Sequence, residues 1–241
     1  MIVQILLRKY NISYDSLLGG YKLEKPRYEY KQKAASLLEG KYTNVIIILL
    51  IMGIISSLGT GYSAGDIAVG GGARSSWANV ISLLLGAAFA YGSITMYMGI
   101  VANKEPSIEE VLLVGFKDNY VRNLVCQLLT TIFVVLWSLL LIIPGIVKAY
   151  AYSMNFYLLK RDPNLSGQDA ITKSKEFTMG YKMDLFMLDL SYLGWYFIGI
   201  FTLGILWLWI VPKHLTARVL YYDEIYAKRV PVPVEKIEVV E

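Results

Sequence analysis

The sequence is poor in charge, in cysteine and in histidine. Only 17% of its 241 residues are charged, whereas a soluble domain of this length usually carries about a quarter. The single cysteine, Cys126, excludes an intramolecular disulfide. The single histidine, His214, excludes the paired-histidine spacings of common zinc sites. These shortages argue against metal and thiol chemistry, so we expect no metal and no cofactor.

The sequence is instead rich in long apolar stretches. Hydrophobic residues make up 56% of the chain, and the apolar runs alternate with charged blocks, a pattern typical of an integral membrane protein. The charged residues gather in four blocks: Arg8–Lys41, Lys104–Arg122, Lys160–Lys182 and Asp223–Glu241. The formal net charge of +4 is therefore attributed to basic loops beside a lipid bilayer, and we expect no nucleic acid partner.

The apolar runs predict an all-α fold with six transmembrane helices. Thr43–Thr60 and Asn79–Ala102 are each long enough for one span. As straight helices, Val121–Leu159 would be about 58 Å long and Met183–Val211 about 44 Å, against a hydrocarbon core of about 30 Å. Each of these two runs is therefore predicted to form a hairpin of two spans. We place the hairpin turns at three residues: Pro144, Gly145 and Gly204.

The distribution of basic residues orients these spans. With both termini in the cytoplasm, almost all of the 23 Lys and Arg residues fall in cytoplasmic segments. Arg74 lies in the expected external loop Gly61–Ala78, and three others lie within spans: Lys148, Lys213 and Arg218. A four-span or five-span topology would export at least five basic residues. Because Lys and Arg are in excess on the cytoplasmic side, we predict a multi-pass protein of the cell membrane with both termini inside.

Three regions follow from this topology. Residues 1–42 are expected to form a cytoplasmic N-terminal segment with a juxtamembrane helix at Tyr28–Gly40. Residues 43–226 form the six-helix membrane domain. Residues 227–241 form a cytoplasmic tail, which we expect to be disordered because it contains two prolines, three glutamates and no aromatic residue.

A cytoplasmic amphipathic helix is predicted between the fourth and fifth spans, at Ser166–Gly180. Ser166 and Asp169 have the spacing of a capping box, with Asp in place of Glu. Gly180 suits the end of this helix because glycine adopts the left-handed conformation that often follows the last helical residue.

Ionisable residues inside the predicted spans are the best candidates for a site. A charged side chain at the centre of a span costs about 2.5–3.5 kcal/mol on insertion scales, so it needs a partner or water. Asp189, Lys213 and Arg218 form the candidate buried charge cluster. By helix rise, Asp189 and Arg218 each lie about 9 Å from the cytoplasmic ends of antiparallel spans. We therefore predict that these two side chains pair.

No catalytic set of residues is evident, and we expect that the protein is not an enzyme. His214 has no acidic residue near it in the sequence that could orient it as a base. The glycines at 70–72 lack the following Lys-Ser/Thr of a phosphate-binding loop. An intramembrane enzyme that uses Asp189 is a third hypothesis, beside the two functions considered below.

Several stretches resemble one family of bacterial membrane proteins, the domain of unknown function 975. They are WSLLLIIPGIVKAYAYSMNFYLL from Trp137, SGQDAITKSKEFTMGYKMDLF from Ser166, LSYLGWYFIGIFTLGILWLWIVP from Leu190, and the late pair Tyr221-Tyr222. The resemblance extends from about Ala34 to Tyr226. It is sharpest at three places: Pro144 to Ile146, Ser174 with Gly180, and Ser191 to Trp195.

The resemblance implies a polytopic bacterial membrane protein and brings no established activity. At one position the chain departs from the family, since Lys213-His214 follows Pro212 where a tyrosine is common. No role is carried over to that position.

Two functions are weighed first. One is a non-enzymatic binding protein or accessory subunit of a membrane transport or export system, whose partners are the lipid bilayer and another membrane protein or an exporter. The alternative is a small-solute or lipid transporter with a cavity around Asp189, Lys213 and Arg218. A dry, packed bundle would favour the first function, and a cavity open to one face at these charges would favour the second.

Overall fold

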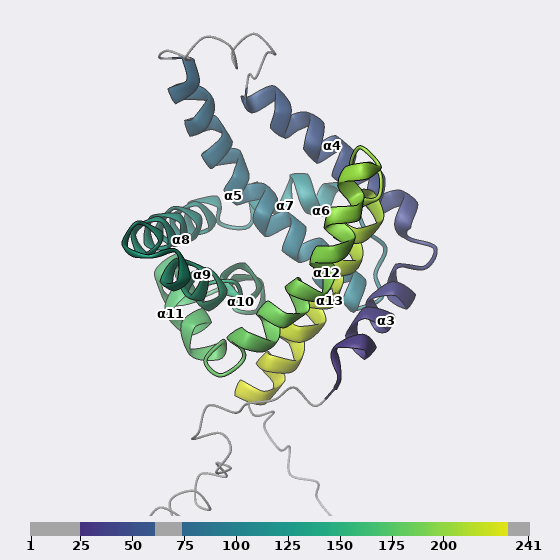
Figure 1. Cartoon of the computed structure of the whole chain (residues 1–241). Coiled ribbons are helices and arrows are strands. Elements are labelled where there is room, and N and C mark those ends of the chain that lie inside the picture. The colour runs from purple at the N-terminus through teal and green to yellow at the C-terminus, as the bar shows by residue number, and fades with distance from the viewer. Residues whose placement is uncertain (1–24, 61–73, 231–241) are drawn as a thin grey trace, which may run out of the picture.

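The computed structural model describes residues 25–60 and 74–230, and all regular structure in this part of the chain is helical (Figure 1). The longer helices are α4 Tyr42–Thr60, α5 Arg74–Val101, α8 Tyr120–Leu140, α12 Lys182–Phe201 and α13 Trp207–Arg229. The shorter ones are α3 Arg27–Leu38, α6 Ile108–Leu112, α7 Val114–Lys117, α9 Ile142–Ala151, α10 Asn155–Arg161 and α11 Gly167–Phe177. The predicted all-α fold is confirmed for the described residues. Most of the predicted N-terminal segment and disordered tail lies outside them.

Among the described residues, three helices are long and apolar enough to cross a membrane: Leu84–Val101 within α5, α8, and α12. A fourth candidate is α3 joined to Tyr42–Ile55, but these two helices meet at 91°. The prediction of six spans is not confirmed. The fourth predicted span is divided between α9 and α10, and α13 is interrupted by charged residues.

The long helices do not form one parallel bundle. In Figure 1, α8 is strongly foreshortened, whereas α5, α12 and α13 lie across the view. The α8–α9 hairpin therefore runs at a steep angle to the α12–α13 hairpin. Helix α5 packs against α4, α8, α10 and α13, and α3 packs along α13. The buried core lies where these helices meet, around Tyr97, Ile100, Tyr157, Leu185 and Ala217.

The turn between α12 and α13 contains Gly204, as the sequence predicts. Leu203 and Gly204 both have positive φ, +52° and +85°. The Gly204 N–H donates to the Gly199 carbonyl at 2.9 Å, a bond that is typical of a helix closed by a left-handed glycine.

The turn between α8 and α9 lies earlier than predicted. Leu141 is the extended residue between the two helices, with φ −160° and ψ 141°, and Pro144 is already in the first turn of α9. Proline is tolerated throughout a first turn, because the N–H groups there have no helical partner. Gly145 instead permits close packing, since a Cβ there would lie 2.2 Å from the Ser138 Oγ on α8.

Side chains at α11 bond the backbone groups at the break between α9 and α10. Ser174 is fully buried, and its hydroxyl donates to the Ala151 carbonyl at 2.8 Å and accepts from the Met154 N–H at 3.1 Å. Thr178 donates to the same carbonyl at 3.2 Å. Buried backbone groups that a helix break releases need partners, and α11 supplies them.

Helices are present at both predicted short segments: α3 lies within Tyr28–Gly40 apart from its first residue, and α11 lies within the predicted amphipathic helix Ser166–Gly180. The Ser166 hydroxyl caps α11 by accepting from the Asp169 N–H at 3.1 Å and donates to the Asp169 carboxylate at 2.6 Å. Gly180, with φ +85°, follows the end of α11, and Gly40, with φ +78°, follows the end of α3.

Glycines allow helix α5 to touch the α6–α7 segment backbone to backbone. A Cβ on Gly92 would lie 2.1 Å from the Val111 carbonyl oxygen, and one on Gly115 would lie 2.0 Å from that of Ala88. No real Cβ tolerates such distances, so any side chain at either position would force these elements apart.

We expect Gly92→Ala to destabilise the fold by about 1–3 kcal/mol, the usual cost of overpacking. Gly86→Ala is the matched control on the same helix, because its Cβ would meet nothing within 4 Å. That variant should be neutral or gain up to about 1 kcal/mol from helix propensity. Thermal unfolding in detergent micelles compares the two, and equal changes in Tm would contradict the close approach.

Candidate functional site

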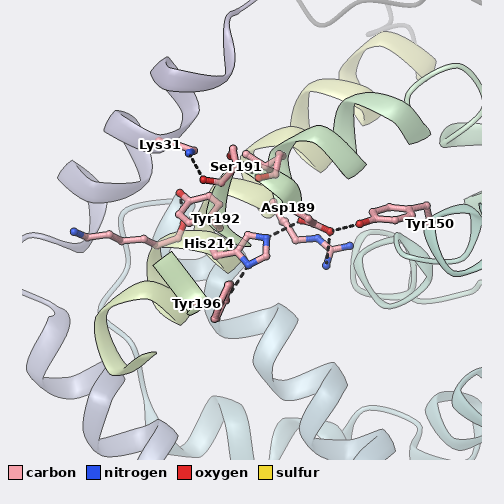
Figure 2. Close-up of polar contacts among 10 residues, drawn as sticks. Lys31, Tyr150, Asp189, Ser191, Tyr192, Tyr196 and His214 are labelled. Carbon is pink, nitrogen blue, oxygen red and sulfur yellow. Dashed lines mark hydrogen bonds and ion pairs between the residues drawn. The ribbon is translucent and has the colours of Figure 1, made fainter. Parts of the chain in front are cut away.

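The Asp189 carboxylate, near the middle of α12, is bound by side chains from two other helices (Figure 2). His214 of α13 contacts its Oδ1 through Nε2 at 2.7 Å. The Tyr150 hydroxyl of α9 donates to its Oδ2 at 2.7 Å. The Arg218 Nη1 lies 3.7 Å from the same Oδ2. Both carboxylate oxygens are therefore engaged within the protein.

His214 continues this network on its other side. Its Nδ1 lies 2.9 Å from the Tyr196 hydroxyl, and its ring stacks on Tyr192 with centroids 4.7 Å apart. When Nε2–H donates to Asp189, the neutral ring accepts from Tyr196 at Nδ1. A continuous chain of hydrogen bonds then runs from Tyr196 through His214 and Asp189 to Tyr150.

The spacing of residues on α13 explains which of them reach Asp189. His214 and Arg218 are four positions apart, so they share one face of the helix. Lys213 precedes His214 by one position and so points about 100° away. Tyr150 brings in α9, so the cluster joins the two hairpins that cross at a steep angle.

The predicted pairing of Asp189 with Arg218 has the geometry of an ion pair, although His214 is the nearer partner. Lys213 does not belong to the cluster. Its ammonium lies 5.7 Å from the centroid of the Tyr42 ring, and no described carboxylate is within ion-pair distance of it. Lys213 instead lines a pocket of about 330 Å³ between α3, α12 and α13, and neither Asp189 nor Arg218 lines that pocket.

The expectation that His214 has no orienting acid is wrong, because Asp189 fills that role from another helix. The signal for this contact was in the sequence. His214 lies one turn before Arg218, so any partner of Arg218 on a neighbouring helix lies close to His214 as well. Tyr150 could not be found in this way, since its position depends on how the two hairpins cross.

In the cluster the acid Asp189 and the base His214 are bonded to each other, and the buried Arg218 Nε has no hydrogen-bond partner in the described part of the chain. Both oxygens of Asp189 and both ring nitrogens of His214 already have partners. Within the described residues, no three His, Cys, Asp or Glu side chains gather as a metal site would need.

One catalytic spacing does occur in the sequence. Gly61–Gly65, GYSAG, matches the Gly-x-Ser-x-Gly of a nucleophile elbow. It lies outside the described residues, and the described part of the chain contains no strand from which such an elbow could turn.

A second polar cluster ties α10 to α13. The Tyr157 hydroxyl and the Arg161 guanidinium both bond the Asp223 carboxylate, and the Arg161 Nε donates to the Tyr157 oxygen at 2.9 Å. Nearby, Tyr30 of α3 bonds Glu224. These contacts join the end of α10, the second half of α13 and the start of α3.

Together, the fold and the cluster define an all-helical protein of apolar hairpins fastened by buried polar contacts. The sequence model of the family described as "Protein of unknown function (DUF975)" matches residues 23–150 and 139–229. The chain belongs to this family, as the resemblance in its sequence indicates. No curated protein and no solved structure is significantly similar to it.

The Asp189 network predicts which substitutions are energetically coupled. In double-mutant cycles, Asp189→Asn and His214→Gln should couple more strongly than Asp189→Asn and Arg218→Gln, because the first pair is in direct hydrogen-bond contact. Polar pairs in membrane proteins couple by about 0.6 kcal/mol on average and at most about 1.7. Unfolding of the detergent-solubilised protein measures both cycles.

Lys213→Gln serves as the control for these cycles. Because Lys213 does not contact Asp189, its effect should add to that of Asp189→Asn within about 0.3–0.5 kcal/mol. Strict additivity of Asp189→Asn with both His214→Gln and Arg218→Gln would contradict the network.

Proposed function

We propose that this protein is a multi-pass protein of the bacterial cell membrane that acts by binding, as an accessory subunit of a membrane transport or export system. The observation that carries the membrane location is the tip of the α8–α9 hairpin. Five consecutive apolar residues there, Leu139–Ile143, are each between 66% and 78% exposed. Contiguous exposed apolar surface of this kind marks contact with a membrane or a partner.

The second hairpin has a similar tip. Phe201 is 78% exposed and Leu203 is 94% exposed, and neither tip carries a charged residue. The uncharged, apolar surface at both hairpin tips suits contact with lipid, where exposed leucine and phenylalanine are favourable.

Contacts at the opposite ends of the helices support the proposed orientation. Arg161 at the end of α10 pairs with Asp223 near the end of α13, and Tyr30 of α3 bonds Glu224. Lys41 donates to Asn103, just after α5, at 3.0 Å. Four segments that the charge distribution assigns to the cytoplasm therefore meet on one side, which is consistent with both termini inside.

In the Asp189 cluster both carboxylate oxygens and both ring nitrogens of His214 are bonded within the protein, which supports binding rather than catalysis. A role as a solute or lipid transporter is the second candidate, and the pocket beside Lys213 favours it. A cavity shared by Asp189, Lys213 and Arg218 does not carry that role, because the pocket of Lys213 includes neither of the other two residues.

Single-cysteine labelling tests the membrane topology. In a Cys126→Ala background, Ser75→Cys should react with an impermeant thiol reagent in intact cells, because residue 75 lies at the start of α5, at the end of that helix that the charge distribution places outside. Lys175→Cys on the exposed face of α11 should react only after the cells are permeabilised. Labelling of Lys175→Cys but not Ser75→Cys in intact cells would reverse the orientation.

The accessory role predicts a specific neighbour on α8. Ile132 is 42% exposed on the apolar surface of this helix, whereas Cys126 is fully buried. A photo-crosslinking residue at position 132 should capture a subunit of a transporter or exporter in native membranes, and the same residue at position 126 should capture none. If position 132 yields only lipid adducts in native membranes, α8 faces the bilayer and the accessory role loses its support.

A further inference from the structure

The pocket between α3, α12 and α13 is lined by two lysines and by no carboxylate, unlike the Asp189 cluster. It measures about 330 Å³, and its lining includes Lys31, Lys213, Trp195, Leu206 and Trp209. Ligand pockets typically have volumes of about 300–1,000 Å³. This one is therefore large enough for a headgroup and the first part of an apolar chain.

Neither pocket lysine has a carboxylate partner among the described residues. The Lys31 ammonium donates to the Ser191 carbonyl at 3.1 Å (Figure 2) and lies 4.4 Å from the centroid of the Tyr192 ring. The Lys213 ammonium lies 5.7 Å from the centroid of the Tyr42 ring. Two half-buried ammonium groups that are held only by a carbonyl and by aromatic rings leave a local excess of positive charge.

The polar and apolar parts of the pocket lie at different heights along helix α13. Trp209 precedes Lys213 by four residues, or about 6 Å along α13, toward the hairpin tip, and Leu206 is closer to the tip still. Trp195 and Trp209 are 55% and 44% exposed, so their rings extend the pocket wall outward. The pocket is therefore cationic at its base and apolar and aromatic toward the tip.

We infer that this pocket binds an anionic phospholipid, with its phosphate at Lys31 and Lys213 and an acyl chain along Trp195, Leu206 and Trp209. This inference rests on the proposed membrane location. Charge complementarity selects an anion, because the pocket holds two cations and no carboxylate. The apolar wall selects an amphiphile over a free anion, since inorganic phosphate would leave the tryptophans and Leu206 without a partner.

Tryptophan quenching tests the site, because Trp195 and Trp209 lie in its wall. The full chain is reconstituted into phosphatidylcholine vesicles that contain a minor fraction of brominated phosphatidylglycerol or, for comparison, brominated phosphatidylcholine. The anionic lipid should quench more strongly than the zwitterionic one. Trp195→Phe combined with Trp209→Phe should abolish this excess, which assigns it to the pocket.

The lysines are tested by charge removal. Lys31→Gln combined with Lys213→Gln should abolish the excess quenching, whereas the paired Arg substitutions should keep it. Lys148→Gln is the matched control and should leave the excess unchanged, because Lys148 lies over Trp137 on the other hairpin. If the Gln pair fails to reconstitute, the two single Gln variants are read instead, and each should reduce the excess.

Three results would overturn the inference. They are equal quenching by the two lipids in the parent chain, excess quenching that survives in the Gln variants, and loss of the excess on addition of soluble glycerol phosphate, which would indicate a site for a small phosphate anion. Vesicle flotation keeps this test separate from the proposed function. A chain that does not float with the vesicles contradicts the membrane location, whereas a chain that floats without lipid preference contradicts only the lipid site.

Discussion

A carboxylate in the middle of an apolar helix has to be matched by donors from other helices, and the arrangement of this protein depends on how Asp189 is matched. Its two oxygens take one donor from α13 and one from α9, and Arg218 supplies the opposing charge. These contacts fix α12 against its hairpin partner. They also position α9, which belongs to the other hairpin, so one side chain holds together two units that cross at a steep angle.

The interior and the periphery of the molecule have opposite characters. Inside, backbones touch at Gly92 and Gly115, and α11 bonds the Ala151 carbonyl and the Met154 N–H at the break between α9 and α10. Outside, apolar residues cover the two hairpin tips and much of α8. The described residues therefore combine a closely bonded centre with an apolar exterior.

The features that the sequence predicts correctly are those that follow from regular helix geometry. The depths of Asp189 and Arg218 matched because every helical residue rises by the same amount, and the same rule at four-residue spacing also points to His214. Lys213 is grouped with them only because it lies within the same predicted span as Arg218, and its direction around the helix separates it from the cluster. The turn that lies at Leu141 is predicted at Pro144 instead, because a proline shows only that a helix begins within one turn of it.

The break between α9 and α10, at Tyr152–Met154, contains no glycine or proline. It exists because the Ser174 hydroxyl can bond the backbone there. Such long-range causes leave no local pattern.

The dependence of that break on Ser174 also sets an order of events during synthesis. The Met154 N–H bonds the hydroxyl of Ser174, which lies 20 residues later in the chain. Helices α9 and α10 are therefore synthesised before the side chain that bonds the break between them. Helix α9 is only about 15 Å long by helix rise, too short to cross a bilayer by itself. The segment from α8 to α11 is thus expected to mature as one unit, in which the last helix to be made completes the first three.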